Sequence, residues 1–96
     1  MQKQIKITYL KKATKFLKKN INTITEESVD TLIVLAIKKK VFDLDVNVDV
    51  KRLKGLLQGK YRIRKGDIRI IIEIHEEEVI IQSIVEDIDF RGNIYK

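Results

Sequence analysis

The stretch that decides the fold is YRIRKGDIRIIIEI, residues 61–74, where apolar and charged residues alternate on both sides of Lys65-Gly66. Successive side chains of a β-strand point to opposite faces, so this alternation predicts two strands that share one apolar face. Lys65-Gly66 is a plausible two-residue turn. We therefore predict an antiparallel hairpin in which Arg62 lies opposite Arg69.

The other face of this hairpin collects three arginines, Arg62, Arg64 and Arg69. Like charges directly opposite each other destabilise a strand pair, unless the face is well hydrated or meets an anion. Guanidinium groups match the geometry of phosphate, which makes phosphate binding the functional interpretation. The structural alternative is a solvated face on which Asp67 or Glu73 neutralises the arginines.

Two helices are predicted before the hairpin. Apolar residues fall at helical intervals over residues 9–21, with lysines opposite, and again from Val29 to Ile37. Thr23 or Thr25 can cap the second helix, and Thr23 with Glu26 has capping-box spacing. The width of its apolar stripe predicts a helix buried on more than one side.

Short strands complete the pattern. Alternation predicts a strand over residues 4–8 and another over residues 79–85, and a last short strand is expected over residues 93–96. Residues 41–50 alternate weakly, which suits either a strand or an extended loop. The order predicts an α+β fold, with the two N-terminal helices on one face of an antiparallel sheet.

Composition limits the class of protein. A chain of 96 residues predicts a single domain, residues 1–96. It has no cysteine and one histidine, so we expect neither a metal site nor a cofactor. The net charge is +6, and bases dominate residues 1–40 while acids dominate residues 70–96. Nucleic acid, anionic lipid and an acidic protein are the partners that such a basic surface favours. The polar N-terminus and the lack of a long apolar run predict a cytoplasmic protein with no membrane partner.

Three stretches together resemble the toxins of the RelE/ParE family: RLKG at 52–55, the hairpin at 61–74 and FRGNIYK at 90–96. The resemblance extends to the expected first helix and is weakest over residues 20–50. It implies two helices over a curved sheet, and a type II toxin–antitoxin module with a cognate antitoxin as partner. RelE-type members cleave mRNA, generally on the ribosome, by attack of the ribose 2′-hydroxyl on the adjacent phosphate without a metal ion.

Carried over position by position, the resemblance gives the candidate catalytic residues Arg62, Arg64, Arg69, Arg91 and Tyr95. The arginines would bind the scissile phosphate, and Tyr95 would assist proton transfer. Basic residues around the hairpin are candidate RNA contacts: Lys54, Lys60 and Lys65.

Departures from the family pattern leave the general base open. Arginines stand where lysines are frequent, and arginine stays protonated. Phe90 stands where histidine is common, so His75 or Asp89 could substitute as the base. Two further functions remain alternatives: inhibition of DNA gyrase, as in ParE-type members, or a non-catalytic module that binds its antitoxin. Tyr95 favours RNA cleavage, because ParE-type members generally lack the tail tyrosine.

Overall fold

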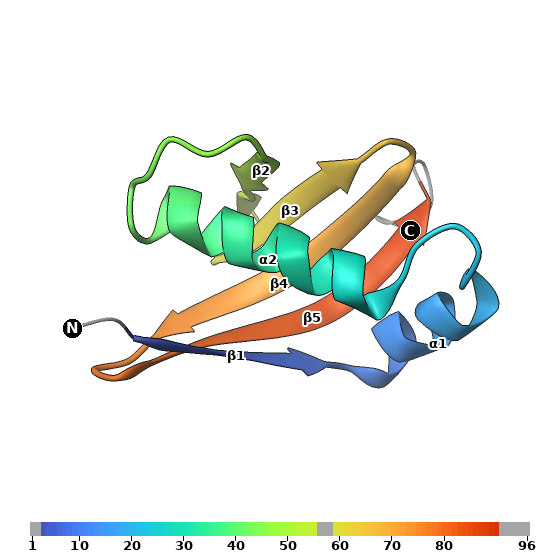
Figure 1. Cartoon of the computed structure of the whole chain (residues 1–96), viewed down its shortest axis with the longest axis horizontal. Coiled ribbons are helices and arrows are strands. Elements are labelled where there is room, and N and C mark those ends of the chain that lie inside the picture. Colours follow the sequence, from blue (N-terminus) through green and yellow to red (C-terminus); the bar gives the residue numbers. More distant parts are fainter. Residues whose placement is uncertain (1–2, 56–58, 91–96) are drawn as a thin grey trace.

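The computed structural model describes residues 3–55 and 59–90. In these ranges it has two helices and a five-stranded sheet, with α2 lying across one face of the sheet and α1 packed beside the end of β5 (Figure 1). In chain order the elements are β1 (Gln4–Tyr9), α1 (Lys11–Lys19), α2 (Glu26–Lys40), β2 (Asp49–Arg52), β3 (Lys60–Lys65), β4 (Ile68–Glu76) and β5 (Ile80–Phe90). The α+β class is therefore confirmed.

The sheet is mixed, so the prediction of an antiparallel sheet is wrong at one edge. The strand order is β1-β5-β4-β3-β2, and β1 runs parallel to β5 while the other neighbours are antiparallel. The backbone amide of Leu10 donates to the carbonyl of Val85 at 2.9 Å at the end of this parallel pair. Alternation reports which face a side chain takes, but it does not report the direction of the neighbouring strand.

The central hairpin turns at Gly66-Asp67, one residue later than predicted. Arg64, and not Arg62, lies opposite Arg69. Gly66 has φ +58°, and a positive φ at the first turn position is what a type II′ turn requires. Moving the turn by one residue changes each partner by two positions, so the paired side chains of both strands keep their predicted faces. Asp67, which we expected on the charged face opposite Arg64, is instead a turn residue.

The second helix begins at Glu26 after the cap residue Thr25. The Thr25 hydroxyl accepts from the backbone amide of Ser28 at 3.2 Å, and the Ser28 hydroxyl accepts from that of Thr25 at 3.2 Å. The capping box is thus Thr25 with Ser28, and the pairing of Thr23 with Glu26 is wrong. One stripe of the helix is fully buried, at Val29, Ile33, Ala36 and Ile37, so the wider burial that we expected is only partial.

The ambiguous segment 41–50 is mostly extended loop, and its last two residues begin β2, which pairs antiparallel with β3. The strand expected over residues 93–96 lies outside the described residues. The core lies between α2 and the sheet and consists largely of isoleucine from β3, β4 and β5. In the described ranges, neither helix has the length and apolar character needed to span a bilayer.

Candidate nucleic-acid interface

The face of the sheet opposite α2, here called the outer face, holds most of the charged side chains of the strands. The strand register places them in rows that cross the sheet from β2 to β5. One row reads Asp49, Arg64, Arg69, Asp89 and the next reads Lys51, Arg62, Ile71, Asp87. The predicted gathering of three arginines on one face is confirmed, with acidic residues on both flanks.

Asp49 is the residue that sequence reasoning missed. It lies at the first position of β2, where its carboxylate accepts from Nε of Arg64 and lies 3.7 Å from an Nη of Arg62. Its side chain is 41% exposed, so this is a surface ion pair. The weak alternation of residues 41–50 carried the signal, since Asp49 would have been placed on the charged face had that segment been assigned as a strand.

Arg69 has a different environment from the other two arginines. It is buried, and its Nη1 donates to the carbonyls of Gly66 at 2.9 Å and Ile68 at 3.3 Å. These bonds tie the guanidinium to the hairpin turn. The open part of the arginine cluster is therefore Arg62 and Arg64, with Arg69 behind them.

Unpartnered polar atoms occur beside the arginines. Within residues 3–55 and 59–90, Nε of Arg62, Oε2 of Glu86 and Oδ1 of Asp87 are buried and have no hydrogen-bond partner. A β-bulge opposite Ile71 and Ile72 inserts Glu86 as an extra residue in β5. Buried polar groups are normally hydrogen-bonded, so these three atoms are not satisfied by the side chains of the described ranges.

A second polar cluster lies further along the same face. Nζ of Lys60 is 2.7 Å from Oε1 of Glu86, and this hydrogen bond raises the pKa of Lys60. Hydrogen bonding to Glu86, and also to His75, lowers the pKa of Glu73. The Nε2 atom of His75 is 3.0 Å from Oε1 of Glu73. These residues neutralise one another and leave no free cation for phosphate.

The two candidate bases lie at different distances from the arginines. His75 is four residues along β4 from Ile71, the partner of Arg62, which corresponds to about 13 Å. Asp89 lies two strands from Arg64 in the same row, about 10 Å away, and its Oδ1 accepts from the backbone amide of Phe90 at 2.7 Å. Neither touches the arginine pair, whereas Asp49 does.

The predicted RNA contacts are divided between the two sides of the sheet. Lys60 lies on the outer face, and Lys54 is exposed just after β2. Lys65 lies opposite Ile68 on the helix side of the sheet, away from Arg62 and Arg64, and its contact with RNA stays a prediction. Arg91 and Tyr95 lie outside the described residues, and their roles stay predictions.

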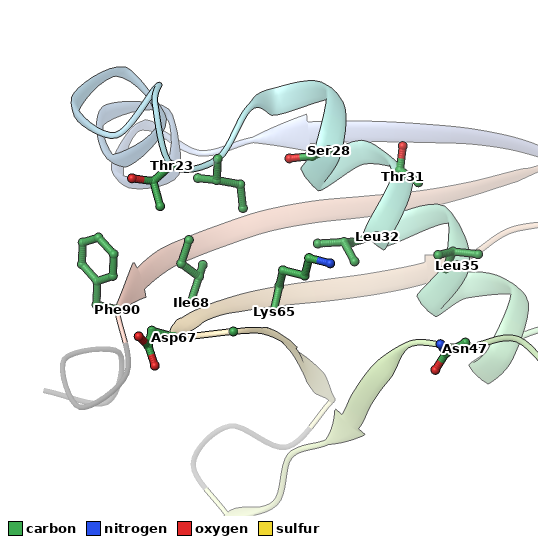
Figure 2. Close-up of a pocket in the computed structure, with 12 residues that line it drawn as sticks. Thr23, Ser28, Thr31, Leu32, Leu35, Asn47, Lys65, Asp67, Ile68 and Phe90 are labelled. Atoms are coloured by element: carbon green, nitrogen blue, oxygen red, sulfur yellow. The ribbon is translucent and has the colours of Figure 1, made fainter.

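On the helix side, Lys65 borders a groove of about 770 Å³ between α2 and the β3–β4 turn. Figure 2 shows Lys65 reaching from β3 toward Leu32 of α2, with Phe90 at the far end of the groove. A ligand in this groove would not contact Arg62 or Arg64. Within the described ranges, no cluster of histidine and carboxylate side chains could hold a metal ion.

The overall fold is that of bacterial and archaeal toxins. The structure is similar to a YoeB/ParE toxin from Agrobacterium tumefaciens (TM-score 0.65, 15% identity, covering 90% of this chain and 98% of that one). It is similar to YafQ from E. coli (TM-score 0.64, 15% identity, covering 93% and 96%). It also matches a RelB–RelE antitoxin–toxin complex from Methanococcus jannaschii (TM-score 0.53, 20% identity, covering 92% and 94%).

These matches confirm the resemblance to RelE/ParE toxins at the level of the fold, over nearly the whole length of each relative. No protein-family model matches the sequence, and no curated protein matches it.

Proposed function

We propose that this chain is the toxin of a toxin–antitoxin module and that it cleaves RNA without a metal ion at the outer face of the sheet. The observation that supports this most is the pair Arg62 and Arg64, whose guanidinium groups both reach the carboxylate of Asp49 on the outer face. This pair lies within the fold shared with YoeB, YafQ and RelE.

The arginines suit the charge changes of the reaction. The 2′-oxygen forms a bond to phosphorus and the bond from phosphorus to the 5′-oxygen breaks, so negative charge increases on the phosphate oxygens in the transition state. Fixed donors aimed at such charge are worth about 10²–10³ in rate each. Arg62 and Arg64 fit this role because both guanidinium groups reach the same point, the carboxylate of Asp49.

The ion pair with Asp49 does not block this role. Exposed ion pairs contribute about 0–1 kcal/mol, so a phosphate can replace the carboxylate at small cost. Once displaced, Asp49 remains next to the bound phosphate and can accept the 2′-hydroxyl proton. We therefore assign Asp49 as the general base. Tyr95 remains the candidate acid for the leaving 5′-oxygen.

The proposed partners are mRNA, on the ribosome, and a cognate antitoxin. An acidic antitoxin segment would bind the same arginines and exclude RNA. The relative from Methanococcus jannaschii is itself a toxin–antitoxin complex, and so is a matching structure from Mycobacterium tuberculosis. The protein is expected to act in the cytoplasm, where these partners occur.

The test is induced expression of the wild type and of Arg62→Gln, followed by mapping of mRNA ends. We expect growth arrest with new 5′-hydroxyl ends in the wild type, and a loss of about 100-fold or more in the variant. Arg52→Gln is the matched control, because Arg52 hydrogen-bonds to Tyr61 on the other face of the sheet. DNA breaks without RNA cleavage would instead identify a gyrase inhibitor, and neither effect would identify a module that only binds its antitoxin.

A further inference from the structure

The first helix presents an unusually dense row of lysines. Its sequence, KKATKFLKK, contains five lysines and no acidic residue, and all five lysines are exposed. At 100° per residue they fall within about a third of the helix circumference. The opposite side packs against the core through Ala13, Phe16 and Leu17, and Phe16 makes an edge-on ring contact with Phe90 at 5.2 Å.

This arrangement of charge destabilises the helix that carries it. Lys15 has another lysine at each of the four helical neighbour positions, three and four residues away: Lys11, Lys12, Lys18 and Lys19. Like charges at these spacings repel. Lysines also occupy the first turn, at the positive end of the helix dipole, and the cap residue Leu10 makes no side-chain hydrogen bond.

The second helix of the same chain has the opposite arrangement. Thr25 caps it, Glu26 and Glu27 stand at its N-terminus, and three lysines stand at its C-terminus. The charges of α2 therefore stabilise α2. In α1, Lys18 and Lys19 stand favourably in the last turn, but the repulsion among the five lysines and the lack of an acidic residue in the first turn are uncompensated within the helix. A bound anion would relieve this repulsion.

Acidic residues balance only one edge of the lysine row. Lys12 forms an ion pair with Asp87 at 3.0 Å, and a cleft of about 410 Å³ between α1 and β5 brings Lys15 and Lys19 near Asp87 and Asp89. Since Asp87 belongs to the outer face, Lys12 joins the lysine row to the face that carries the arginines. Lys11, Lys15 and Lys18 form no ion pair with any residue of the described ranges.

We propose that the lysine row of α1 binds the phosphate backbone of RNA, as a second contact beside the outer face. This inference rests on the proposed function and identifies the substrate contact that supplies affinity independently of the chemistry. Flexible, strongly hydrated ammonium groups suit contacts to phosphate that carry no base specificity.

Two other anionic partners fit less well. Interfaces between proteins are depleted in lysine and enriched in arginine and aromatic residues, and α1 exposes lysine alone. A helix that binds a membrane surface inserts its apolar side into the lipid. The apolar side of α1 is already packed against the sheet, so it has nothing to insert.

The test compares Lys15→Gln/Lys18→Gln with the control Lys38→Gln/Lys40→Gln, which removes the same charge from exposed positions at the end of α2. Glutamine and lysine have similar helix propensities, so both variants should fold. Binding is measured to a labelled single-stranded RNA with 2′-O-methyl groups, which cannot be cleaved by 2′-attack, over a range of salt concentrations. Each lost phosphate contact lowers the slope of log affinity against log salt by about 0.7.

We expect the slope to fall by about 1.4 in the α1 variant and to stay unchanged in the α2 control. An unchanged slope in the α1 variant would overturn the inference, and so would a loss of binding only to phosphatidylserine vesicles or to an acidic protein. Because this RNA is not cleaved, the result is separate from the proposed function: RNA binding through α1 without any cleavage would contradict the nuclease and retain the inference.

Discussion

Replacing Asp49 by asparagine separates binding of the phosphate from proton transfer. In the wild type the carboxylate pairs with Arg64 and lies 3.7 Å from Arg62, and its side chain is 41% exposed. The pair contributes at most about 1 kcal/mol, so its loss should lower Tm by no more than about 8 °C for a domain of this size. In the variant, a phosphate no longer has to displace the carboxylate from the two arginines. Removing a cost of up to about 1 kcal/mol should tighten binding of uncleavable RNA by up to about fivefold.

Cleavage should change in the opposite direction. If Asp49 accepts the 2′-hydroxyl proton, its loss should slow cleavage by about 10²–10⁴-fold. The assay is single-turnover cleavage of a labelled RNA, with binding of its 2′-O-methyl analogue measured beside it. Asp45→Asn is the matched control, since Asp45 is an exposed carboxylate in the loop before β2. Cleavage that is unchanged or faster in the Asp49 variant would refute the assignment of Asp49 as the base.

Three further predictions concern stability. Tyr9→Phe removes a hydrogen bond of 2.6 Å to Asp30 and should lower the free energy of unfolding by about 1 kcal/mol. Burial, and then this hydrogen bond, raises the pKa of Tyr9. The wild type, but not the variant, should therefore lose this stabilisation as the pH rises above about 10. Ser83→Ala removes a fully buried hydroxyl that has no partner in the described ranges, so Tm should rise by about 4–8 °C, and a fall would show that the hydroxyl is satisfied. The pKa of Glu73 is lowered, so its ionised side chain stabilises the fold above the ordinary pKa of 4.5 and loses this effect as the pH falls. In urea titrations, the free energy of unfolding of Glu73→Gln should therefore decrease less on acidification than that of the wild type. Identical pH profiles would contradict this.

The two faces of the hairpin could be predicted from the sequence, because strand alternation fixes faces independently of register. The turn position could not, since Lys65-Gly66 and Gly66-Asp67 are both acceptable turns and the glycine takes a positive φ at the first position of the second. Cross-strand partners depend on that choice, so a turn at Lys65-Gly66 predicts Arg62 opposite Arg69, whereas the structure has Arg64 there.

The candidate site was predicted in part for a related physical reason. Arg62, Arg64 and Arg69 could be placed on one face from local alternation alone, but the burial of Arg69 under its own turn depends on the turn geometry. Asp49 comes to the arginines from β2, a strand of four residues with only weak alternation. The parallel direction of β1 could not be predicted from local pattern either, because its partner β5 lies at the other end of the sequence.

The central claim is that Arg62 and Arg64 bind phosphate on the outer face. The most direct measurement is an NMR titration of the arginine Nε–H signals with a 2′-O-methyl RNA. The signals of Arg62 and Arg64 should shift together as phosphate replaces the carboxylate of Asp49, while the signal of Arg52, which lies on the opposite face, should stay in place. Unmoved signals from Arg62 and Arg64 at saturating RNA would contradict the account.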